Sequence, residues 1–172
     1  MRDHIGASEL TSLVEAEVGI CDEMVHLAQR EQHALARFRP AHLPELLAAQ
    51  DDCAHRFART HEALEASIGR AAEHVGIADA GSPSLDVSAL LPYLPPDARE
   101  RLEDLRSALE GRAYTLAVLN AQNALLVRTG LVQLGQTANV LADVLGESPA
   151  YGASGSVCLP TANHTLVLDR QA

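Results

Sequence analysis

Glu23 and His26 stand three positions apart, a spacing that puts a carboxylate and an imidazole on one face of a helix. Helical bundles that bind a pair of metal ions carry this Glu-x-x-His pattern twice and add two further glutamates. The sequence contains the pattern once, and His33, His55 and His61 add no pair at ligand spacing. We therefore predict that the chain holds no metal ion and needs no cofactor.

Motifs for nucleophilic catalysis and for phosphate binding are missing from the sequence as well. It has neither a glycine-rich phosphate loop nor a Gly-x-Ser-x-Gly turn. Cys21, Cys53 and Cys158 have no metal-ligand spacing and no persuasive histidine partner, so we expect free thiols. The segment from Tyr151 to Gly155 follows a predicted helix and precedes none, which argues against a nucleotide loop. The chain is not expected to be an enzyme.

Asn120 and Asn123 lie in a stretch from Ala113 to Ala142 whose only charge is Arg128. A solvated helix normally carries charges on its outer face, so this stretch is either covered on most sides or open to a partner. An asparagine on a helical seam can select one alignment of a bundle at a cost in stability. Alternatively, amides in an apolar groove would orient the amphipathic helix of another protein. The sequence leaves both interpretations open.

We expect helices to position these residues, because the amino-acid composition suits a helical core. Hydrophobic residues make up 47% of the chain, whereas aromatic residues make up 3% and tryptophan is absent. An interior of leucine, alanine and valine favours helices over a sandwich of aromatic strands. At 172 residues the chain can bury one core without staples. We predict a helical bundle domain over residues 1–146 and a flexible C-terminal tail over residues 147–172.

Two long amphipathic helices are predicted in the first half of the chain. From Leu10 to Phe38, apolar residues recur at alternating steps of three and four, the seam of a coiled coil, with Ser8 as the expected N-cap. Pro40 and Pro44 end this helix and open the next, which is expected from Leu43 to Val75. A connection this short makes the two helices an antiparallel hairpin.

A third long helix is predicted after a loop rich in Gly and Pro, from Gly76 to Pro96, that has one short turn over Leu85 to Leu91. The helix should begin at Asp97 and run to about Leu145. Its leucine seam is strong as far as Leu126 and weaker beyond it.

The C-terminal part of the chain is predicted to be less regular than the rest. Gly130 and Gly135 favour a kink or a frayed end in the third helix. After Gly146 only Thr165 to Leu168 has a weak strand pattern. The predicted fold class is all-α: a long antiparallel helical hairpin plus a third long helix, packed as a coiled-coil-like bundle.

The charge balance excludes two classes of partner. The chain has 23 acidic residues, 13 arginines and no lysine, and its net charge of −10 disfavours nucleic acid and anionic lipid. Scattered amides interrupt the uncharged stretch too often for a membrane span. The first residues, Met1 to His4, lead into no apolar run of the kind that signal peptides have. We expect a cytoplasmic protein that does not insert into membranes.

Three features in this order resemble the FlgN family of flagellar export chaperones. Glu17 and Glu31 lie inside the first leucine seam, and a Glu-Gln-His-Ala-Leu run that begins at Glu31 precedes a short break. The third helix carries a Leu-x-x-Leu-Asn-x-x-Asn run from Leu116 to Asn123, and a Tyr-Gly-x-x-Gly segment follows at Tyr151. The resemblance covers about residues 8 to 157 and rests on the ordered combination.

The resemblance implies a chaperone that binds the C-terminal helical segment of the hook-associated proteins, which form the hook–filament junction. The chaperone would keep these clients unassembled before type III export. Within the third helix, the family pattern assigns client binding to Leu116, Leu119, Asn120, Asn123, Leu126 and Val127. It assigns docking at a component of the export gate to Tyr151 and Gly152. The alternative is a structural or signalling bundle without a client, for example a coiled-coil homodimer whose third helix packs against its own copy.

Overall fold

The computed structural model describes residues 6–77, 85–145, 150–151 and 157–158. Contacts divide the chain into two compact units, Met1–Leu126 and Val127–Ala172. This boundary falls inside a helix, α3 (Pro96–Leu145). The division into bundle and tail at Gly146, which the sequence suggests, stays a prediction.

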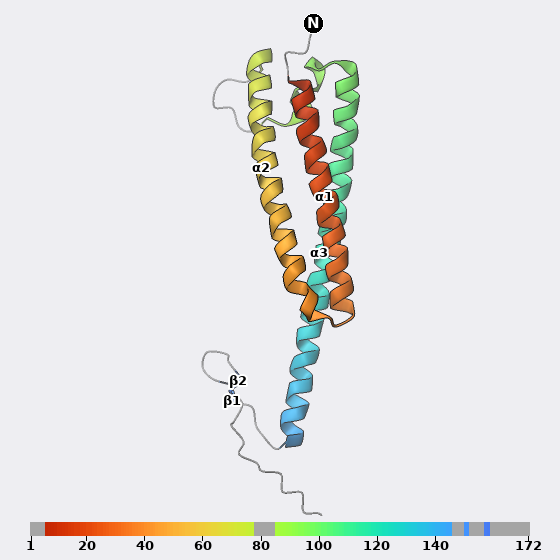
Figure 1. The fold of residues 1–172 in the computed structure, drawn as a ribbon, viewed down its shortest axis with the longest axis vertical. Helices are drawn as coiled ribbons and strands as arrows, with labels where there is room; N and C mark the ends of the chain where they lie inside the picture. Colours follow the sequence, from red (N-terminus) through yellow and green to blue (C-terminus); the bar gives the residue numbers. More distant parts are fainter. Residues whose placement is uncertain (1–5, 78–84, 146–149, 152–156, 159–172) are drawn as a thin grey trace, which may run out of the picture. The chain divides into compact units, whose positions relative to one another are not determined.

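The first unit begins with an antiparallel pair of helices, α1 (Ala7–Ala36) and α2 (Leu43–Val75), joined through the 3₁₀ helix η2 (Pro40–His42). Figure 1 shows α1 in red to orange and α2 in orange to yellow, side by side and running in opposite directions. Proline has a fixed φ and no N–H, so Pro40 and Pro44 suit the first turns in which they lie. The predicted hairpin is confirmed, including the bounds of its second helix.

The start of α1 differs from the prediction. Gly6 precedes the helix in the left-handed region, at φ 69°, and its carbonyl accepts the bond from the Leu10 N–H at 2.9 Å. Glycine takes this angle without a Cβ clash, so the helix begins before Ser8, which is already helical. The prediction of Ser8 as N-cap was therefore wrong. Glu9 lies in the first turn, where the helix dipole favours a carboxylate.

A Schellman motif ends α2 in the usual way. The Gly76 N–H donates to the Glu73 carbonyl at 3.2 Å, and the Ile77 N–H donates to the Ala72 carbonyl at 3.1 Å. This pair of bonds needs one left-handed residue, and Gly76 supplies it at φ 74°.

The same motif ends α1 with a different residue in the left-handed position. The Phe38 N–H donates to the Leu35 carbonyl at 3.1 Å, and the Arg39 N–H donates to the Ala34 carbonyl at 2.9 Å. Phe38 has φ 50° and is the non-glycine residue with positive φ in the described part of the chain. A side chain in this conformation costs about 1 kcal/mol relative to glycine.

Two short 3₁₀ helices, η3 (Val87–Ala89) and η4 (Leu91–Tyr93), connect the hairpin to α3. The first lies within the short turn predicted over Leu85 to Leu91, whereas the second was not predicted. α3 begins at Pro96, with Asp97 in its first turn. Gly130 and Gly135 are helical like their neighbours, so the helix continues through both residues. In the described part of the chain, none of the helices combines the length and the apolar character that a membrane crossing requires.

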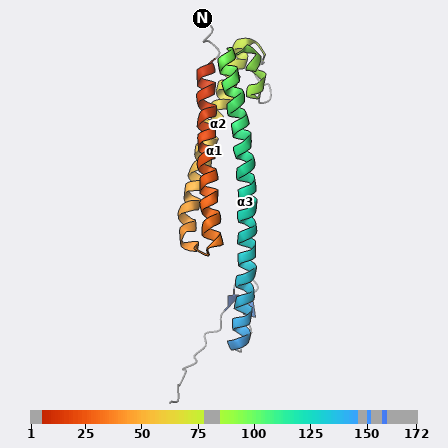
Figure 2. The same cartoon turned by 90° about the vertical axis from the view of Figure 1, so that its right-hand side faces the viewer.

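Within the first unit, α3 lies beside α1 in both views of the fold (Figures 1 and 2). Arginines of α3 bridge to carboxylates of α1: Arg101 Nη2 lies 2.6 Å from Glu15 Oε1, and Arg112 Nε lies 2.6 Å from Asp22 Oδ1. Exposed pairs of this kind contribute about 0–1 kcal/mol each. Most of the stability of the unit must come from buried apolar surface.

Two buried apolar clusters form the core of the first unit. One joins α1, α2, the 3₁₀ helices and the start of α3, and includes Leu10, Ile68, Leu90 and Leu102. The other fills the hairpin between α1 and α2, and includes Ile20, Leu27, Leu46 and Cys53. Together they confirm that leucine and alanine, rather than aromatic rings, build the interior.

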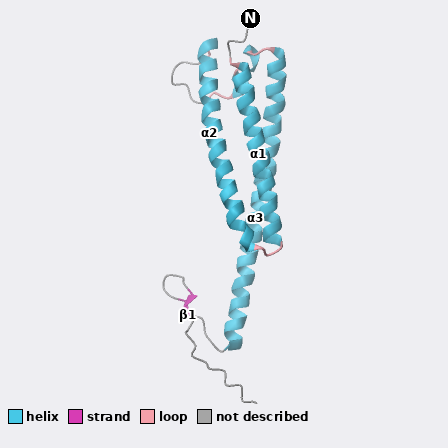
Figure 3. Ribbon diagram, viewed as in Figure 1, coloured by secondary structure: helices cyan, strands magenta, loops and turns pink. Residues whose placement is uncertain are grey.

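The second unit contains the rest of α3 and two short strands, β1 (Ala150–Tyr151) and β2 (Val157–Cys158) (Figure 3). The strands pair antiparallel, with Ala150 opposite Cys158 and Tyr151 opposite Val157. The sequence indicates no strand here, because two residues are too few for an alternating pattern. Thr165 to Leu168, where a weak strand was predicted, lies outside the described residues. The all-α fold class is confirmed.

Candidate functional site

Glu23, the carboxylate of the Glu-x-x-His pattern, is engaged by α2. Arg56 Nη1 donates to Glu23 Oε2 at 2.8 Å and Arg56 Nη2 donates to Glu23 Oε1 at 3.1 Å. These bonds lower the pKa of the Glu23 carboxyl. His26 is exposed. Over the described ranges, no three His, Cys, Asp or Glu side chains come together to hold a metal ion.

Cys21 and Cys53 are buried free thiols, as predicted. Burial raises the pKa of both thiols. Protonated, buried thiols are poor nucleophiles and behave as small apolar residues. The side chain of Cys158 lies outside the described residues.

Asn123, one of the two asparagines of the uncharged stretch, is buried against α1. Its Nδ2 donates to the Ala28 carbonyl at 3.0 Å and to Glu31 Oε2 at 3.0 Å. Gln50 on α2 donates to the same Glu31 oxygen at 2.9 Å. We call Glu31, Gln50 and Asn123 the Glu31 junction, because this one carboxylate connects α1, α2 and α3. The geometry agrees with the interpretation of Asn123 as a residue that sets the alignment of the bundle.

The residues predicted to bind a client lie in two environments. From residue 111 to Leu126, the positions that are not fully exposed are Arg112, Leu116, Leu119, Asn123 and Leu126, in steps of four, three, four and three. They form the inner seam of the first unit. Asn120, by contrast, is exposed, and so is Val127 in the second unit. The predicted leucine seam is thus confirmed as far as Leu126: Leu102 and Leu105 are buried, and Leu116, Leu119 and Leu126 are half-buried.

The part of α3 in the second unit carries a separate apolar series. Val127, Leu131, Leu134, Ala138 and Leu141 follow steps of four, three, four and three, and all are exposed. We call these five residues the outer stripe. This spacing places them on one face of the helix. Leu131 and Leu134 are each 64% exposed, and no charge lies between Thr129 and Ala142. A bare apolar stripe of this kind is typical of a surface that binds a partner.

The outer stripe is present in the sequence but is easy to miss. The inner seam, continued in the same register beyond Leu126, meets Gly130, Gln133 and Thr137, which are not large apolar residues. The apolar series instead advances by one residue, to Val127. The boundary between the two compact units falls at the same point. The signal of the stripe in the sequence is therefore a second apolar series, offset by one residue from the first.

A comparison with protein families agrees with a bundle of this kind. The family model described as FlgN protein matches residues 1–157. The chain belongs to the FlgN family. FlgN proteins are flagellar export chaperones and not enzymes. The match confirms the resemblance that the sequence shows over about residues 8 to 157. No curated protein and no solved structure matches the chain.

The second predicted site of this FlgN-family chain lies on β1. The backbone of Tyr151 pairs with that of Val157. The side chain of Tyr151 and the whole of Gly152 lie outside the described residues. The structure therefore gives the backbone setting of this segment, and its docking role stays a prediction.

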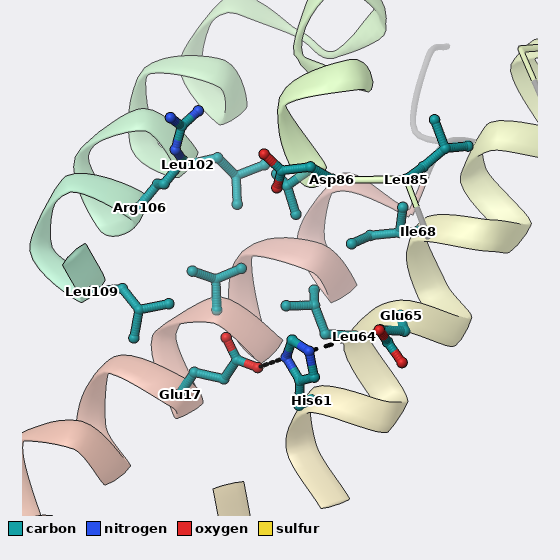
Figure 4. A pocket seen from close by; sticks show the side chains of 12 residues that line it. Glu17, His61, Leu64, Glu65, Ile68, Leu85, Asp86, Leu102, Arg106 and Leu109 are labelled. Carbon is teal, nitrogen blue, oxygen red and sulfur yellow. Dashed lines mark hydrogen bonds and ion pairs between the residues drawn. The ribbon is translucent and has the colours of Figure 1, made fainter. Parts of the chain in front are cut away.

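One hollow in the first unit of the FlgN-family chain holds polar groups that no sequence motif indicates (Figure 4). It measures about 270 Å³. Glu17 on α1 is 1% exposed, and its Oε1 lies 2.9 Å from Nδ1 of His61 on α2. Leu64, Ile68 and Leu102 supply apolar walls.

A carboxylate–imidazole pair can move a proton, but the described lining of this hollow has no Ser, Thr, Cys or Lys to act as a nucleophile. Glu17 and His61 instead connect α1 to α2 by a hydrogen bond. Because His61 is half-exposed, this one bond only partly offsets the cost of burying the Glu17 carboxylate.

Glu17→Met should therefore stabilise the first unit by about 1 kcal/mol, since an apolar side chain of similar size removes the buried charge. His61→Ala should destabilise it by about 2 kcal/mol, because the carboxylate stays buried without its partner. Urea unfolding of both variants at neutral pH measures the two effects. A loss of stability in Glu17→Met as large as that in His61→Ala would show that the pair is a net stabilising contact.

Proposed function

We propose that this FlgN-family chain is a cytoplasmic export chaperone whose outer stripe binds the C-terminal helical segment of flagellar hook-associated proteins. Binding would cover the surface through which a client assembles with its neighbours in the hook–filament junction. The chaperone would then deliver the client to the export gate.

The exposure of the outer stripe is the observation that carries the proposal. Five apolar positions at coiled-coil spacing face solvent on a stretch of α3 whose one charged residue is Arg128. An amphipathic client helix offers the complementary apolar face, in the helix-in-groove mode of recognition. Micromolar affinity needs about 8 kcal/mol, which a few leucine anchors can supply.

Val127 is the residue of the predicted client-binding set that belongs to the outer stripe. Leu116, Leu119 and Leu126 are half-buried in the first unit, and Asn123 is held inside it by the Glu31 junction. Asn120 is exposed and keeps its proposed role as a polar contact. We propose that the outer stripe provides the affinity for the client, whereas the inner seam packs α3 into the bundle.

The proposal is tested by titrating the purified chain with synthetic peptides that correspond to the C-terminal helices of hook-associated proteins. Micromolar binding of one peptide, seen by calorimetry, would support it. Absence of binding to any of these peptides by a folded chain would overturn it.

A second candidate is a homodimer without a client. The same outer stripe favours it, because four-three spacing is also the seam of a two-stranded coiled coil. Sedimentation velocity distinguishes the two: a dimer that stays intact in the presence of client peptides supports the homodimer, whereas a monomer that binds peptide supports the chaperone.

Tyr151→Ala should leave client affinity unchanged and weaken binding to the export-gate component about tenfold, since an aromatic side chain is a typical interface anchor. Binding of the client-loaded chain to the purified gate component measures the effect, and Tyr151→Phe, which keeps the ring, is the matched control. If Tyr151→Ala instead lowers the melting temperature and client affinity together, Tyr151 is a structural residue.

A further inference from the structure

The turn between α1 and α2 displays an aromatic side chain at a strained position. Phe38 holds the left-handed site of the Schellman motif, where α2 has Gly76, and it is 71% exposed. A phenylalanine there strains the backbone and recovers little by burial. The needs of the fold alone would favour glycine at this position.

Arginines without ion pairs flank Phe38. Across the described residues, Arg30, Arg37 and Arg39 make no salt bridge, whereas Arg70 and Arg101 each pair with a carboxylate. The unpaired arginines line a hollow of about 190 Å³ together with two histidines and Glu45. The hairpin tip is defined here by Arg30, His33, Arg37, Phe38, Arg39 and His42.

The local charge at the hairpin tip is opposite to that of the whole chain, which is −10. Glu45 is the carboxylate that lines the hollow, and Glu31, next to Arg30 in sequence, accepts bonds from Gln50 and Asn123. The guanidinium groups of the tip can therefore bind an anionic group of another molecule.

We propose that the hairpin tip binds an acidic segment of another protein, with carboxylates on Arg37 and Arg39 and an apolar side chain against Phe38. The proposal does not depend on client binding by the outer stripe. Guanidinium groups pair with carboxylates through two parallel bonds, and the exposed ring supplies an apolar contact between them.

A short acidic peptide suits the tip better than a long polyanion does. Charges interact over a Debye length of about 8 Å at physiological salt, so a peptide confined to the tip meets mainly its arginines. A nucleic acid or an anionic membrane extends beyond the tip. The rest of the chain is acidic, with a net charge of −10 overall, and repels such a polyanion. Phe38 adds a preference for a segment that carries an apolar residue among its acids.

Fluorescence anisotropy with a short peptide of alternating glutamate and leucine tests the proposal. The wild-type chain should bind this peptide, and added salt should weaken the complex. Phe38→Gly and the double variant Arg37→Gln/Arg39→Gln should each lower the affinity about tenfold. Arg59→Gln is the matched control, because Arg59 is exposed on α2.

Phe38→Gly separates binding from stability, because glycine relieves the left-handed strain and the melting temperature should not fall. Three results would overturn the proposal. The first is equal binding of a peptide with glutamine in place of glutamate, and the second is unchanged affinity in Phe38→Gly. The third is that the wild-type chain binds oligothymidylate or phosphatidylglycerol vesicles and that Phe38→Gly or Arg37→Gln/Arg39→Gln abolishes this binding. The tip would then be a site for nucleic acid or lipid.

Discussion

A chain that carries Leu131→Asp and Leu134→Asp is expected to lose at least about a hundredfold of its affinity for the C-terminal helix of a hook-associated protein. Each leucine buried in an interface contributes about 1.5–3 kcal/mol, and each aspartate adds the cost of desolvating a carboxylate. Both residues are 64% exposed, so the substitutions leave the core of the first unit intact. Calorimetric titration measures the loss, and circular dichroism should show an unchanged helix content.

Val132→Asp is the matched control for these variants. Val132 is also more than half exposed and adjoins Leu131 in sequence, but it lies off the outer stripe. It should therefore keep client affinity to within about twofold. Equal losses in Val132→Asp and in Leu131→Asp would mean that general hydrophobicity, rather than the stripe, attracts the client.

The same change at Leu119 and Leu126 would be a poorer test. Both leucines are half-buried on the inner seam, on the side of α3 where Asn123 reaches α1. An aspartate at either position would disturb the packing of the first unit as well as any contact with a client. Loss of binding in such a variant would not distinguish the two causes.

Glu31→Ala is expected to destabilise the first unit by about 2–4 kcal/mol. Glu31 Oε2 accepts bonds from Asn123 at 3.0 Å and from Gln50 at 2.9 Å, and its loss leaves the buried Asn123 amide short of a partner. A hydrogen bond to a charged group contributes about 1.5–3 kcal/mol, and an unpaired buried donor costs about 1–3 kcal/mol. Denaturant unfolding of the variant measures the effect.

Two further variants assign that loss to the Glu31 junction. Glu31→Gln keeps the size and one acceptor oxygen, so it should cost less than half as much as Glu31→Ala. A double-mutant cycle with Asn123→Ala should give a coupling energy of about 1–2 kcal/mol. A coupling near zero would contradict the geometry of the junction, even if each single variant were destabilised.

The sequence predicts the helices well because long periodic patterns carry redundant information. Both ends of the helix from Leu43 to Val75 are predicted correctly, because Pro40 and Pro44 mark its start and Gly76 marks its end. The start of α1 is missed by contrast, because Ser8 and Gly6 are both plausible helix starts. The choice between them depends on one backbone angle, which no periodicity reveals.

The candidate sites are predicted less well, because faces of a helix cannot be told apart without a partner. Asn123 looks equally suited to a core and to a groove until its bonds to Ala28 and Glu31 are seen. Glu17 lies on a leucine seam as an apparent interruption, and its hydrogen bond to His61 comes from 44 residues away. Contacts between distant residues of this kind leave no local pattern in a sequence.

On the proposed function, the advance of the apolar register at Leu126 gives one helix two sets of residues, one that holds the bundle and one that binds the client. Substitutions at exposed positions usually change stability by less than about 0.5 kcal/mol, so changes in the outer stripe should leave the folding free energy of the bundle almost untouched. A lineage of such chains could then exchange one client for another through a few surface leucines. Cargo specificity would evolve without the compensating core mutations that most changes of binding partner require.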